Sequence, residues 1–531
     1  MFSAAISPES SAKSPLASTT SNRRYGVLDH RSEHGVVALI ADGDERGMIS
    51  GADVVSLQSE IAALLRRVTT ARQEESAASL RLSERYIEAK QSIQTGAVAG
   101  GIEARLRASG LFDPASYLVL NPDLDIARND AWQHFCEHGL RERRAFTTPE
   151  TVARLLAEMA APLQAERFCL TRLAEAAFAK GDEVDVAAPL RRRGMKVAVF
   201  CSSLGNFYMR EIADMLVWGL QAEGIDTARR DETSNPGEPF DLRVFVAPHE
   251  FFWLGQGKAW TEVAGAAGSV LYNVEQPQTQ WFCRAFPLLL DAPLVLDINL
   301  QSAMILRRAG CNVVHFMPGH LPTARYAQPC LDISSIPITK GYDFARQPYD
   351  WLAQNRLDER PIDALFIGAR APRRDDALIR LQALADRHRF WCIYREPSAP
   401  FTEQSGAAAE AGWALAQRAK IVLNLHRDWI GYFEWPRIVL QGFWQGACIV
   451  SDPGLSAPLF TPGVHYLEEN LRHVGELVRW LLETEEGRDK LDRTRMAGYE
   501  RASTVGSMHV ALAPVLGAFA TALQISSPIP L

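Results

Sequence analysis

The chain has 531 residues, of which 47% are hydrophobic and 22% are charged, a composition that excludes a wholly disordered or fibrous protein. It holds 56 Lys and Arg against 63 Asp and Glu, so the formal net charge is −7, and no long basic run is present. This balance argues against a protein that coats nucleic acid. The eight cysteines form no CxxC pair, which argues against a zinc ribbon and favours a reducing compartment.

The first hundred residues contain two different kinds of sequence. Residues 1–50 mix Ser, Thr, Pro and Gly with short charged pieces, which predicts disorder, and no secretory signal is expected. Residues 51–98 are predicted to hold an amphipathic helix, because apolar residues recur three and four positions apart. These are Val54, Leu57, Ile61, Leu64 and Val68. Self-association through residues 54–95 is a further hypothesis, although two heptads are fewer than a coiled coil needs.

Residues 99–150 are predicted to form a small helical module. Asp113-Pro114 is a helix-start pair, Asn121-Pro122-Asp123 interrupts the chain, and Gly139 is predicted to end a helix. Residues 151–193 are predicted to be a helical connector. The C-terminal segment HVALAPVLGAFATAL is predicted to be a helix that closes the last domain, because it is shorter than the ~20 residues of a membrane span and contains Pro514.

An alternation of short apolar runs with helical patterns begins at Gly194 and predicts an α/β fold. The runs MKVAVFCSS, DLRVFVAP, GSVLYNVE, APLVLDIN and CNVVHFMPG belong to a first Rossmann-like domain, residues 194–340. A second domain, residues 341–531, holds IDALFIGAR, HRFWCIYR, AKIVLNLHRD, GACIVSDP and HYLEEN, with a helix expected over WPRIVLQGFWQG. Because ligands bind at the carboxyl ends of parallel strands, the expected site is a cleft between the two domains.

Two groups of polar residues follow strands of the second domain. In IGARAPRRDDALIRL a strand ends near Gly368, and the loop before the next helix carries Arg370, Arg373 and Arg374. Backbone amides at a helix start, together with guanidinium groups, suit a diphosphate. The alternative is a solvated basic loop paired with the adjacent acidic residues. The loop matches neither GxGxxG nor a Walker motif, which argues against NAD binding and ATP hydrolysis.

The second group follows the strand AKIVLNL. Asn424 and His426 stand at its carboxyl end, and Glu434 and Arg437 lie near the start of the next predicted helix. A carboxylate there can accept hydrogen bonds from both hydroxyls of a ribose, and an arginine can pair with a phosphate. The alternative is a surface salt bridge between residues three apart on a helix.

These residues resemble the donor-binding region of GT-B glycosyltransferases, especially the segment of the "glycosyl transferases group 1" type. The resemblance is carried by Glu434, Arg437, the strand Gly446-Ala447-Cys448-Ile449-Val450 and the turn Phe460-Thr461-Pro462-Gly463. It implies two Rossmann-like domains facing a cleft, with a nucleotide-sugar held by the second. The phosphates would meet the loop 368–374, Glu434 would hold the ribose or sugar, and Arg437 the diphosphate. The chain departs from the E-x7-E pattern of many such enzymes, since Glu434 is followed by Gln441.

A second resemblance concerns the helical module. FDPASYLVLNPDL and AWQHFCEHGLRERRAF are similar to an FDxxYYLxxNPD-type module found beside glycosyltransferase domains in bacterial surface-polysaccharide proteins. The resemblance implies a structural docking role for this module.

Acceptor chemistry is expected in the first domain. His249 and Glu250 follow one predicted strand, and Glu275 follows the next, so these three are the candidate catalytic residues. The aromatic run Phe251-Phe252-Trp253 is expected to offer ring faces to a sugar or lipid. No DxD motif follows a strand, which predicts that the donor binds without a metal. Arginines and a helix dipole would then offset the charge of the leaving group.

The sequence thus predicts a bacterial, cytoplasmic hexosyltransferase, with peripheral attachment to the inner membrane left open. Its partners would be a nucleotide-sugar donor, which is a co-substrate rather than a cofactor, and a surface glycan, a lipid-linked intermediate or a protein as acceptor. A non-catalytic scaffold of the same fold and a nucleotide-sugar epimerase are the alternatives.

Overall fold

The computed structural model describes residues 101–180, 185–336, 339, 342–346, 349–395 and 411–524. The predictions of disorder over residues 1–50, of a helix over 51–98 and of self-association through 54–95 lie outside the described residues.

The first sheet has six parallel strands in the order β2-β1-β3-β4-β5-β6. The strands are β1 Lys196–Phe200, β2 Asp226–Arg230, β3 Leu242–Val246, β4 Ser269–Asn273, β5 Leu294–Asp297 and β6 Val313–His315. Five of them are the predicted ones. Strand β2 was not predicted from the sequence, because this edge strand reads DTARR and is mostly polar.

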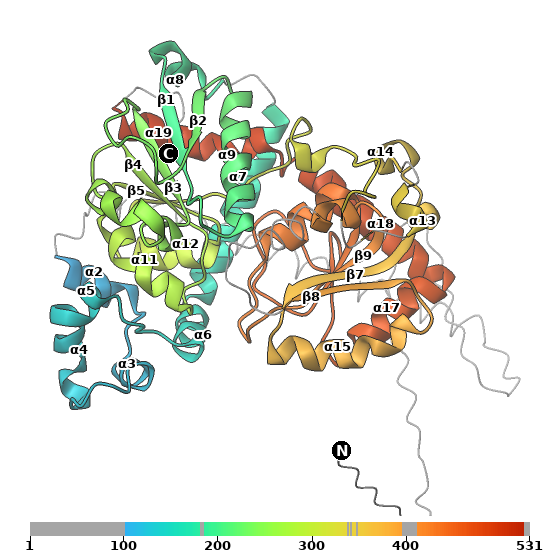
Figure 1. The fold of residues 1–531 in the computed structure, drawn as a ribbon, viewed down its shortest axis with the longest axis horizontal. Coiled ribbons are helices and arrows are strands. Elements are labelled where there is room, and N and C mark those ends of the chain that lie inside the picture. The colour runs from blue at the N-terminus through green and yellow to red at the C-terminus, as the bar shows by residue number, and fades with distance from the viewer. Residues whose placement is uncertain are drawn as a thin grey trace, which may run out of the picture. The chain divides into compact units, whose positions relative to one another are not determined.

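The second sheet has five parallel strands in the order β11-β10-β9-β7-β8. They are β7 Ile362–Ala369, β8 Phe390–Arg395, β9 Ala419–Asn424, β10 Cys448–Ser451 and β11 Leu467–Glu468. The prediction of an α/β chain with two parallel sheets, as expected from the resemblance to GT-B glycosyltransferases, is confirmed (Figure 1).

Alternation along the strands places side chains in cores on both faces of the first sheet. Val197 and Val199 pack in one core, whereas Ala198 and Phe200 pack in the other. Burial on both faces explains why these strands read as continuous apolar runs. Helices cover the sheets, and the carboxyl ends of the strands are left to carry polar loops. The described helices of this half are α8 Ala188–Arg193, α9 Phe207–Ala222, α10 Pro248–Phe251, α11 Gln280–Asp291 and α12 Leu300–Arg308.

The helices that follow the first sheet include one that returns to it. They are α13 Asp343–Arg346, α14 Trp351–Gln354, α15 Pro372–Ala385, α17 Val474–Glu483, α18 Glu485–Ser503 and α19 Met508–Ala522. The predicted helix over 435–446 is instead a π-helical turn, Trp435–Leu440, and a 3-10 turn, Phe443–Gln445. The last helix, α19, packs against α7, α8 and α9 of the first half rather than closing the second. Among the described residues, no helix has the length and apolarity needed to cross a bilayer.

Two chain segments run side by side where α19 begins and form an isolated parallel bridge between His320 and Ser507. The backbone N–H of His320 donates to Gly506 O at 2.9 Å, and the N–H of Met508 donates to His320 O at 2.8 Å. A Cβ atom on Gly319 would lie 2.4 Å from the backbone O of Ser507, so only glycine permits this close approach. His320 is buried here against Trp444.

The helical module contains α2 Ile102–Ser109, α3 Pro114–Leu120, α4 Ala131–His134 and α5 Leu140–Glu142. The predicted helix start is confirmed, because the Asp113 carboxylate accepts the N–H of Ser116 at 2.8 Å. The prediction for Gly139 is wrong: it lies in a π-helical turn, and the left-handed residue is Arg143, with φ 56°. A Cβ atom on Gly139 would lie 2.5 Å from the Tyr117 hydroxyl, so this glycine serves packing instead.

The connector between the module and the first sheet holds α6 Pro149–Glu158 and α7 Ala160–Lys180. Successive residues of α7 contact different halves of the chain. Glu166 pairs with Arg307 of α12, and Arg167 donates to the backbone carbonyls of Ala457 and Phe460. The helix therefore joins α12 of the first half to the loop after β10.

Candidate active site

The three candidate catalytic residues lie together at the carboxyl edge of the first sheet. His249 and Glu250 occupy the short helix α10 after β3, and Glu275 follows the neighbouring strand β4. The Nε2 atom of His249 is 3.8 Å from Oε2 of Glu275. Glu250 accepts the backbone N–H of Asn206 at 2.9 Å, and the absence of a side chain on Gly205 makes room for that carboxylate.

Burial sets the protonation of this cluster. It raises the pKa of Glu250 to about 7, with the negative charge of Glu275 adding to the effect. Burial also raises the pKa of Glu275 to about 7. The same desolvation, helped by the positive charge of Arg284, lowers the pKa of His249 to about 3, so its imidazole is neutral at pH 7. Two carboxyls that titrate near neutrality are suited to general acid–base catalysis.

The aromatic run after Glu250 divides between core and surface. Phe251 and Phe252 are buried in the core with Phe245, so the expectation that they offer ring faces to a ligand is wrong. Both rings pack against Phe245 of β3, at the start of the loop that follows this strand. Trp253 is 43% exposed and is the one ring of the run at the surface.

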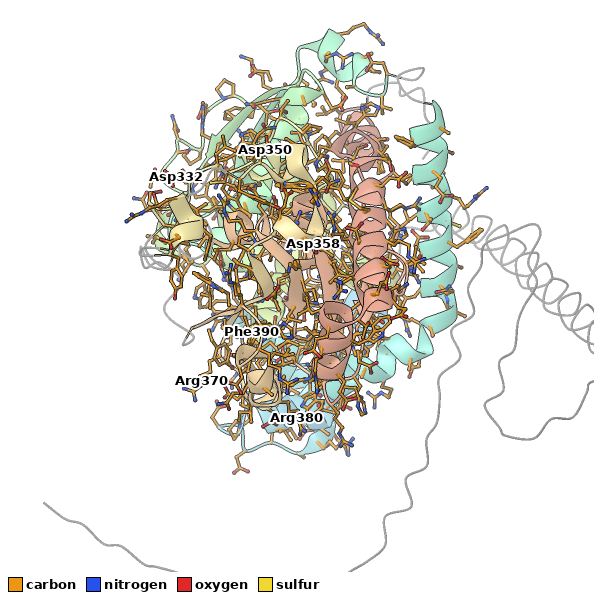
Figure 2. All side chains as sticks on the ribbon, turned by 90° about the vertical axis from the view of Figure 1, so that its right-hand side faces the viewer. Asp332, Asp350, Asp358, Arg370, Arg380 and Phe390 are labelled. Atoms are coloured by element: carbon orange, nitrogen blue, oxygen red, sulfur yellow. The ribbon has the colours of Figure 1, made fainter. Side chains whose placement is uncertain are left out.

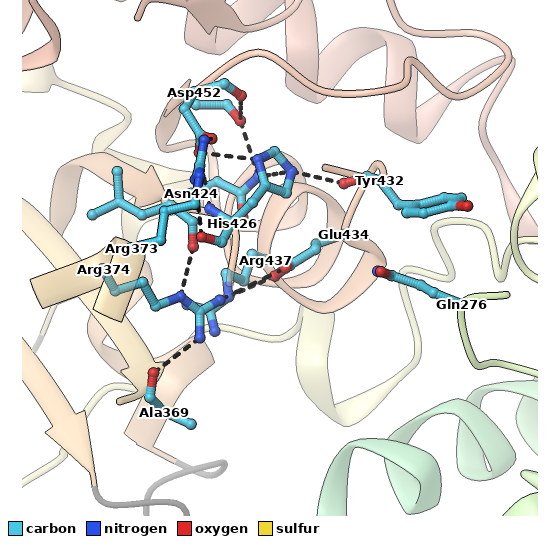
Figure 3. Close-up of polar contacts among 12 residues, drawn as sticks. Gln276, Ala369, Arg373, Arg374, Asn424, His426, Tyr432, Glu434, Arg437 and Asp452 are labelled. Carbon is cyan, nitrogen blue, oxygen red and sulfur yellow. Dashed lines mark hydrogen bonds and ion pairs between the residues drawn. The ribbon is translucent and has the colours of Figure 1, made fainter. Parts of the chain in front are cut away.

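Glu434 and Arg437 form the polar centre of the second half (Figure 3). Arg437 Nε donates to Glu434 Oε2 at 2.9 Å, and a guanidinium nitrogen of Arg374 lies 3.7 Å from Glu434 Oε1. Burial alone would raise the pKa of Glu434, but the positive charges of Arg437 and Arg374 outweigh it and lower the pKa. Glu434 is therefore ionised at neutral pH, and its side chain remains 21% exposed.

One nitrogen of Arg437 is buried and has no hydrogen-bond partner in the structure. A buried donor of this kind is costly unless a ligand or water completes it. The salt bridge that sequence spacing allowed is therefore present, but it lies in the interior beside Phe366 rather than on a solvated helix surface.

The predicted phosphate loop is mostly tied to the protein itself. Gly368 lies within β7, not at the start of α15. Arg374 Nε donates to Leu425 O at 2.8 Å, and its Nη1 donates to Ala369 O at 3.0 Å. Burial lowers the pKa of Arg374 to about 10, which leaves it charged. This arginine holds the ends of β7 and β9 together and positions Glu434.

Arg373 has a similar supporting role, whereas Arg370 lies at the surface. Arg373 donates to His426 O at 3.0 Å and to the Asp452 carboxylate at 2.5 Å. The side chain of Arg370 is 54% exposed, beside Asp375, and lies at the outer edge of the loop before α15 (Figure 2). Of the three arginines, Arg370 is thus the one accessible to a ligand phosphate.

Asn424 and His426 form a buried support beneath these groups. Asn424 donates to Ser451 Oγ at 3.0 Å. The two ring nitrogens of His426 face acceptors, Asp452 Oδ1 at 2.9 Å and Tyr432 O at 2.8 Å. Burial would lower the pKa of His426, but the Asp452 carboxylate outweighs it and raises the pKa. Neither side chain reaches the surface, so both position the loops after β9 and β10.

Asp452 was not among the candidate site residues predicted from the sequence. Its carboxylate accepts hydrogen bonds from the His426 ring, the His426 backbone N–H and Arg373. The signal was present, because Asp452 directly follows β10 at the same sheet edge as Asn424. Among the described residues, no group of three His, Cys, Asp or Glu side chains is placed to hold a metal ion, and metal independence remains a prediction.

The two clusters are linked by charge. The loop after β9 carries Arg427 and Asp428, whose opposite charges act on Glu275 of the first half. A groove of about 630 Å³ lies beside this loop. It is lined by α6, α7, the start of α12 and residues 429–431 and 453–456. A smaller hollow of about 220 Å³, along residues 325–336, contains none of the predicted site residues.

No protein-family model and no curated protein matches the chain. Several solved structures are similar to it. HepE of Anabaena in complex with UDP and glucose is 11% identical, with 62% of this chain and 100% of that chain covered and a TM-score of 0.40. Sucrose-phosphate synthase of Thermosynechococcus elongatus is 11% identical, with 62% of this chain and 99% of that chain covered and a TM-score of 0.40. A glycosyltransferase of Rickettsia africae is 10% identical, with 62% of this chain and 99% of that chain covered and a TM-score of 0.37.

Proposed function

We propose that the protein is a glycosyltransferase that moves a hexosyl group from a nucleotide-sugar to a hydroxyl of a glycan, lipid-linked or protein acceptor. The observation that carries the proposal is a pair of complementary clusters at the carboxyl ends of two parallel sheets. One cluster offers carboxyls that titrate near pH 7, Glu250 and Glu275. The other offers an ionised carboxylate beside a buried, incompletely bonded arginine, Glu434 and Arg437.

The second half would bind the donor. Glu434 can accept hydrogen bonds from two hydroxyls of a ribose or hexose, while Arg437 fixes the position of its carboxylate. The unpartnered nitrogen of Arg437 and the exposed guanidinium of Arg370 can offset the negative charge of a diphosphate. His426, Asp452, Arg373 and Arg374 keep these groups in place without contacting the ligand.

The first half would activate the acceptor. An ionised Glu275 or Glu250 accepts the proton of the attacking hydroxyl, whose oxygen bonds to the anomeric carbon. The bond from that carbon to the diphosphate oxygen breaks, and the nucleoside diphosphate leaves with the bonding electrons. Neutral His249, 3.8 Å from Glu275, would orient this carboxylate rather than compete for the proton.

A thermal-shift measurement tests the donor site. The full chain is melted with UDP-, GDP-, CMP- and dTDP-sugars, as wild type, Glu434→Ala and Arg437→Ala, each compared with its own ligand-free melting temperature. Ligand that binds the native state alone raises the melting temperature. We expect one nucleotide to produce a shift of several degrees that both variants abolish.

The Arg356–Glu359 pair supplies matched controls, since it has the same three-residue spacing but is exposed. Arg356→Ala and Glu359→Ala should keep the wild-type shift. No shift with any nucleotide-sugar would favour the non-catalytic scaffold. A shift that survives both Glu434→Ala and Arg437→Ala would reject this location of the donor site.

A further inference from the structure

Two tryptophans and two arginines form a surface patch beside the acid–base cluster. This aromatic–arginine patch consists of Arg143, Trp253, Trp281 and Arg284. The guanidinium carbons of Arg143 and Arg284 lie 4.9 and 4.8 Å from the ring centroid of Trp253, and that of Arg284 lies 4.5 Å from the centroid of Trp281. The two tryptophans are 43% and 41% exposed. Large rings left exposed at this level mark a candidate binding surface.

The positive charge of the patch is not balanced by the protein. Within the described ranges, neither Arg143 nor Arg284 forms an ion pair or side-chain hydrogen bond with a carboxylate. The neighbouring Arg144 differs, since it pairs with both Asp123 and Glu142. Burial, together with the positive charge of Arg284, lowers the pKa of Arg143. Two like charges are therefore held close together with their hydrogen-bond donors available to an anion.

The backbone holds Arg143 in an uncommon conformation. Its φ of 56° is left-handed, and its N–H donates to Leu140 O at 3.1 Å at the end of α5. A non-glycine residue is strained in this region, and such strain gathers at functional sites. The side chain comes from the helical module, whereas Trp281 and Arg284 come from α11, and the module's α2 contacts α11.

The patch continues into the acid–base cluster. The rings of Trp281 and His249 lie 6.1 Å apart between centroids, and His249 is 3.8 Å from Glu275. A ligand that covers Trp281 would thus extend from the arginines toward the carboxyls. The distance from Trp281 through His249 to Glu275 is on the scale of one sugar ring beside the reacting hydroxyl.

We infer that the aromatic–arginine patch is an acceptor subsite for an anionic saccharide, one that carries a carboxylate or a phosphate on or next to the ring bearing the accepting hydroxyl. Trp281 supplies flat apolar surface for the sugar ring beside the Arg284 guanidinium. The guanidinium groups supply paired donors that match a carboxylate or phosphate. This inference rests on the proposed function, because it assigns the acceptor class of the same site.

A matched set of sugars tests the charge requirement. Methyl glucoside, its 6-phosphate and methyl glucuronide share one ring and differ only in the group at C6. Dissociation constants are measured by NMR titration with the full chain. We expect at least one anionic sugar to bind about tenfold more tightly than methyl glucoside, with a preference that weakens as salt is added. The anion that gains most distinguishes phosphate-bearing from carboxylate-bearing acceptors.

Variants locate the preference. The double variant Arg143→Gln/Arg284→Gln should bind all three sugars alike, and Trp281→Ala should weaken all three. Arg141→Gln removes an exposed charge two residues away and is the matched control, expected to keep the preference. Melting temperatures of all variants are measured, so that a loss of folding is recognised. Equal binding of the three sugars by the wild type, or an unchanged preference in the double variant, would overturn the inference.

The donor-induced thermal shift of the wild type separates the two proposals. A wild type that shows the shift but no preference for anionic sugars contradicts the acceptor subsite alone. A wild type that shows neither contradicts the proposed function as well.

Discussion

The imidazole of His249 lies 3.8 Å from the carboxylate of Glu275, although the two residues follow different strands. The register of β3 and β4 produces this contact, because neighbouring parallel strands end at the same sheet edge. Burial keeps the imidazole of His249 neutral and raises the pKa of the Glu275 carboxyl to about 7. The pair therefore differs from an ordinary surface ion pair. Its expected consequence is a pH dependence that neither residue would show in water.

The rate of nucleoside diphosphate release in the presence of acceptor should rise with pH and level off above about 7. A carboxyl with a pKa of about 7 is protonated below that pH and cannot accept the hydroxyl proton. We expect the rate to fall tenfold per pH unit between about 6.5 and 5.5, and Glu275→Gln to lower it by about 10²-fold or more. The exposed Glu262 gives the control Glu262→Gln, which should follow the wild-type profile. A flat profile from pH 5.5 to 8.5 would exclude these carboxyls as the base.

Asp452→Asn should destabilise the fold strongly. The buried carboxylate faces both His426 and Arg373, and its neutralisation leaves two cations without compensation. Breaking a buried pair in this way costs about 3–5 kcal/mol in the free energy of unfolding, which urea titration measures. Glu476→Gln at the exposed pair with His473 should cost about 1 kcal/mol or less.

The effect of Asp452→Asn should itself depend on pH. The folded-state pKa of His426 is raised, so its contribution to stability is complete below the unfolded value of about 6.5 and is lost as pH rises through the folded pKa. The difference between wild type and variant should therefore be largest near pH 6 and smaller at high pH. A difference that grows with pH would contradict a charged His426.

Glu211→Gln should stabilise the protein at neutral pH. Glu211 is buried on α9, and one of its carboxylate oxygens has no hydrogen-bond partner. Burial, with a smaller contribution from the negative charge of Asp214, raises the pKa of Glu211 to about 8. The folded state holds its proton between about pH 4.5 and 8 while the unfolded state releases it, so stability falls as pH rises through this window. The gain from the amide should be small near pH 4.5 and on the order of 3 kcal/mol at pH 7.

Urea titrations at both pH values measure this gain. Glu262→Gln again serves as the control, because this side chain is exposed. An equal effect of Glu211→Gln at pH 4.5 and pH 7 would mean that Glu211 does not retain its proton in the folded protein.

Local sequence patterns were enough to predict the α/β class, ten of the eleven strands in the described residues and the helix start at Asp113. These features depend on local patterns, namely apolar runs buried on both faces of a sheet and a capping carboxylate beside proline. The position of His249, Glu250 and Glu275 was predictable for the same reason, since each lies within four residues of the end of a strand. The strand β2 escaped because an edge strand needs few apolar residues.

The role of each polar side chain depends on its partners in the folded protein. Arg374 carries the same charge and lies in the same loop as Arg370, yet strand ends distant in sequence surround it and use its donors internally. Phe252 and Trp253 are adjacent in sequence, but one fills the core and the other faces Arg143. Partners of this kind come from segments far apart along the chain, and their distances depend on packing, which no local pattern encodes.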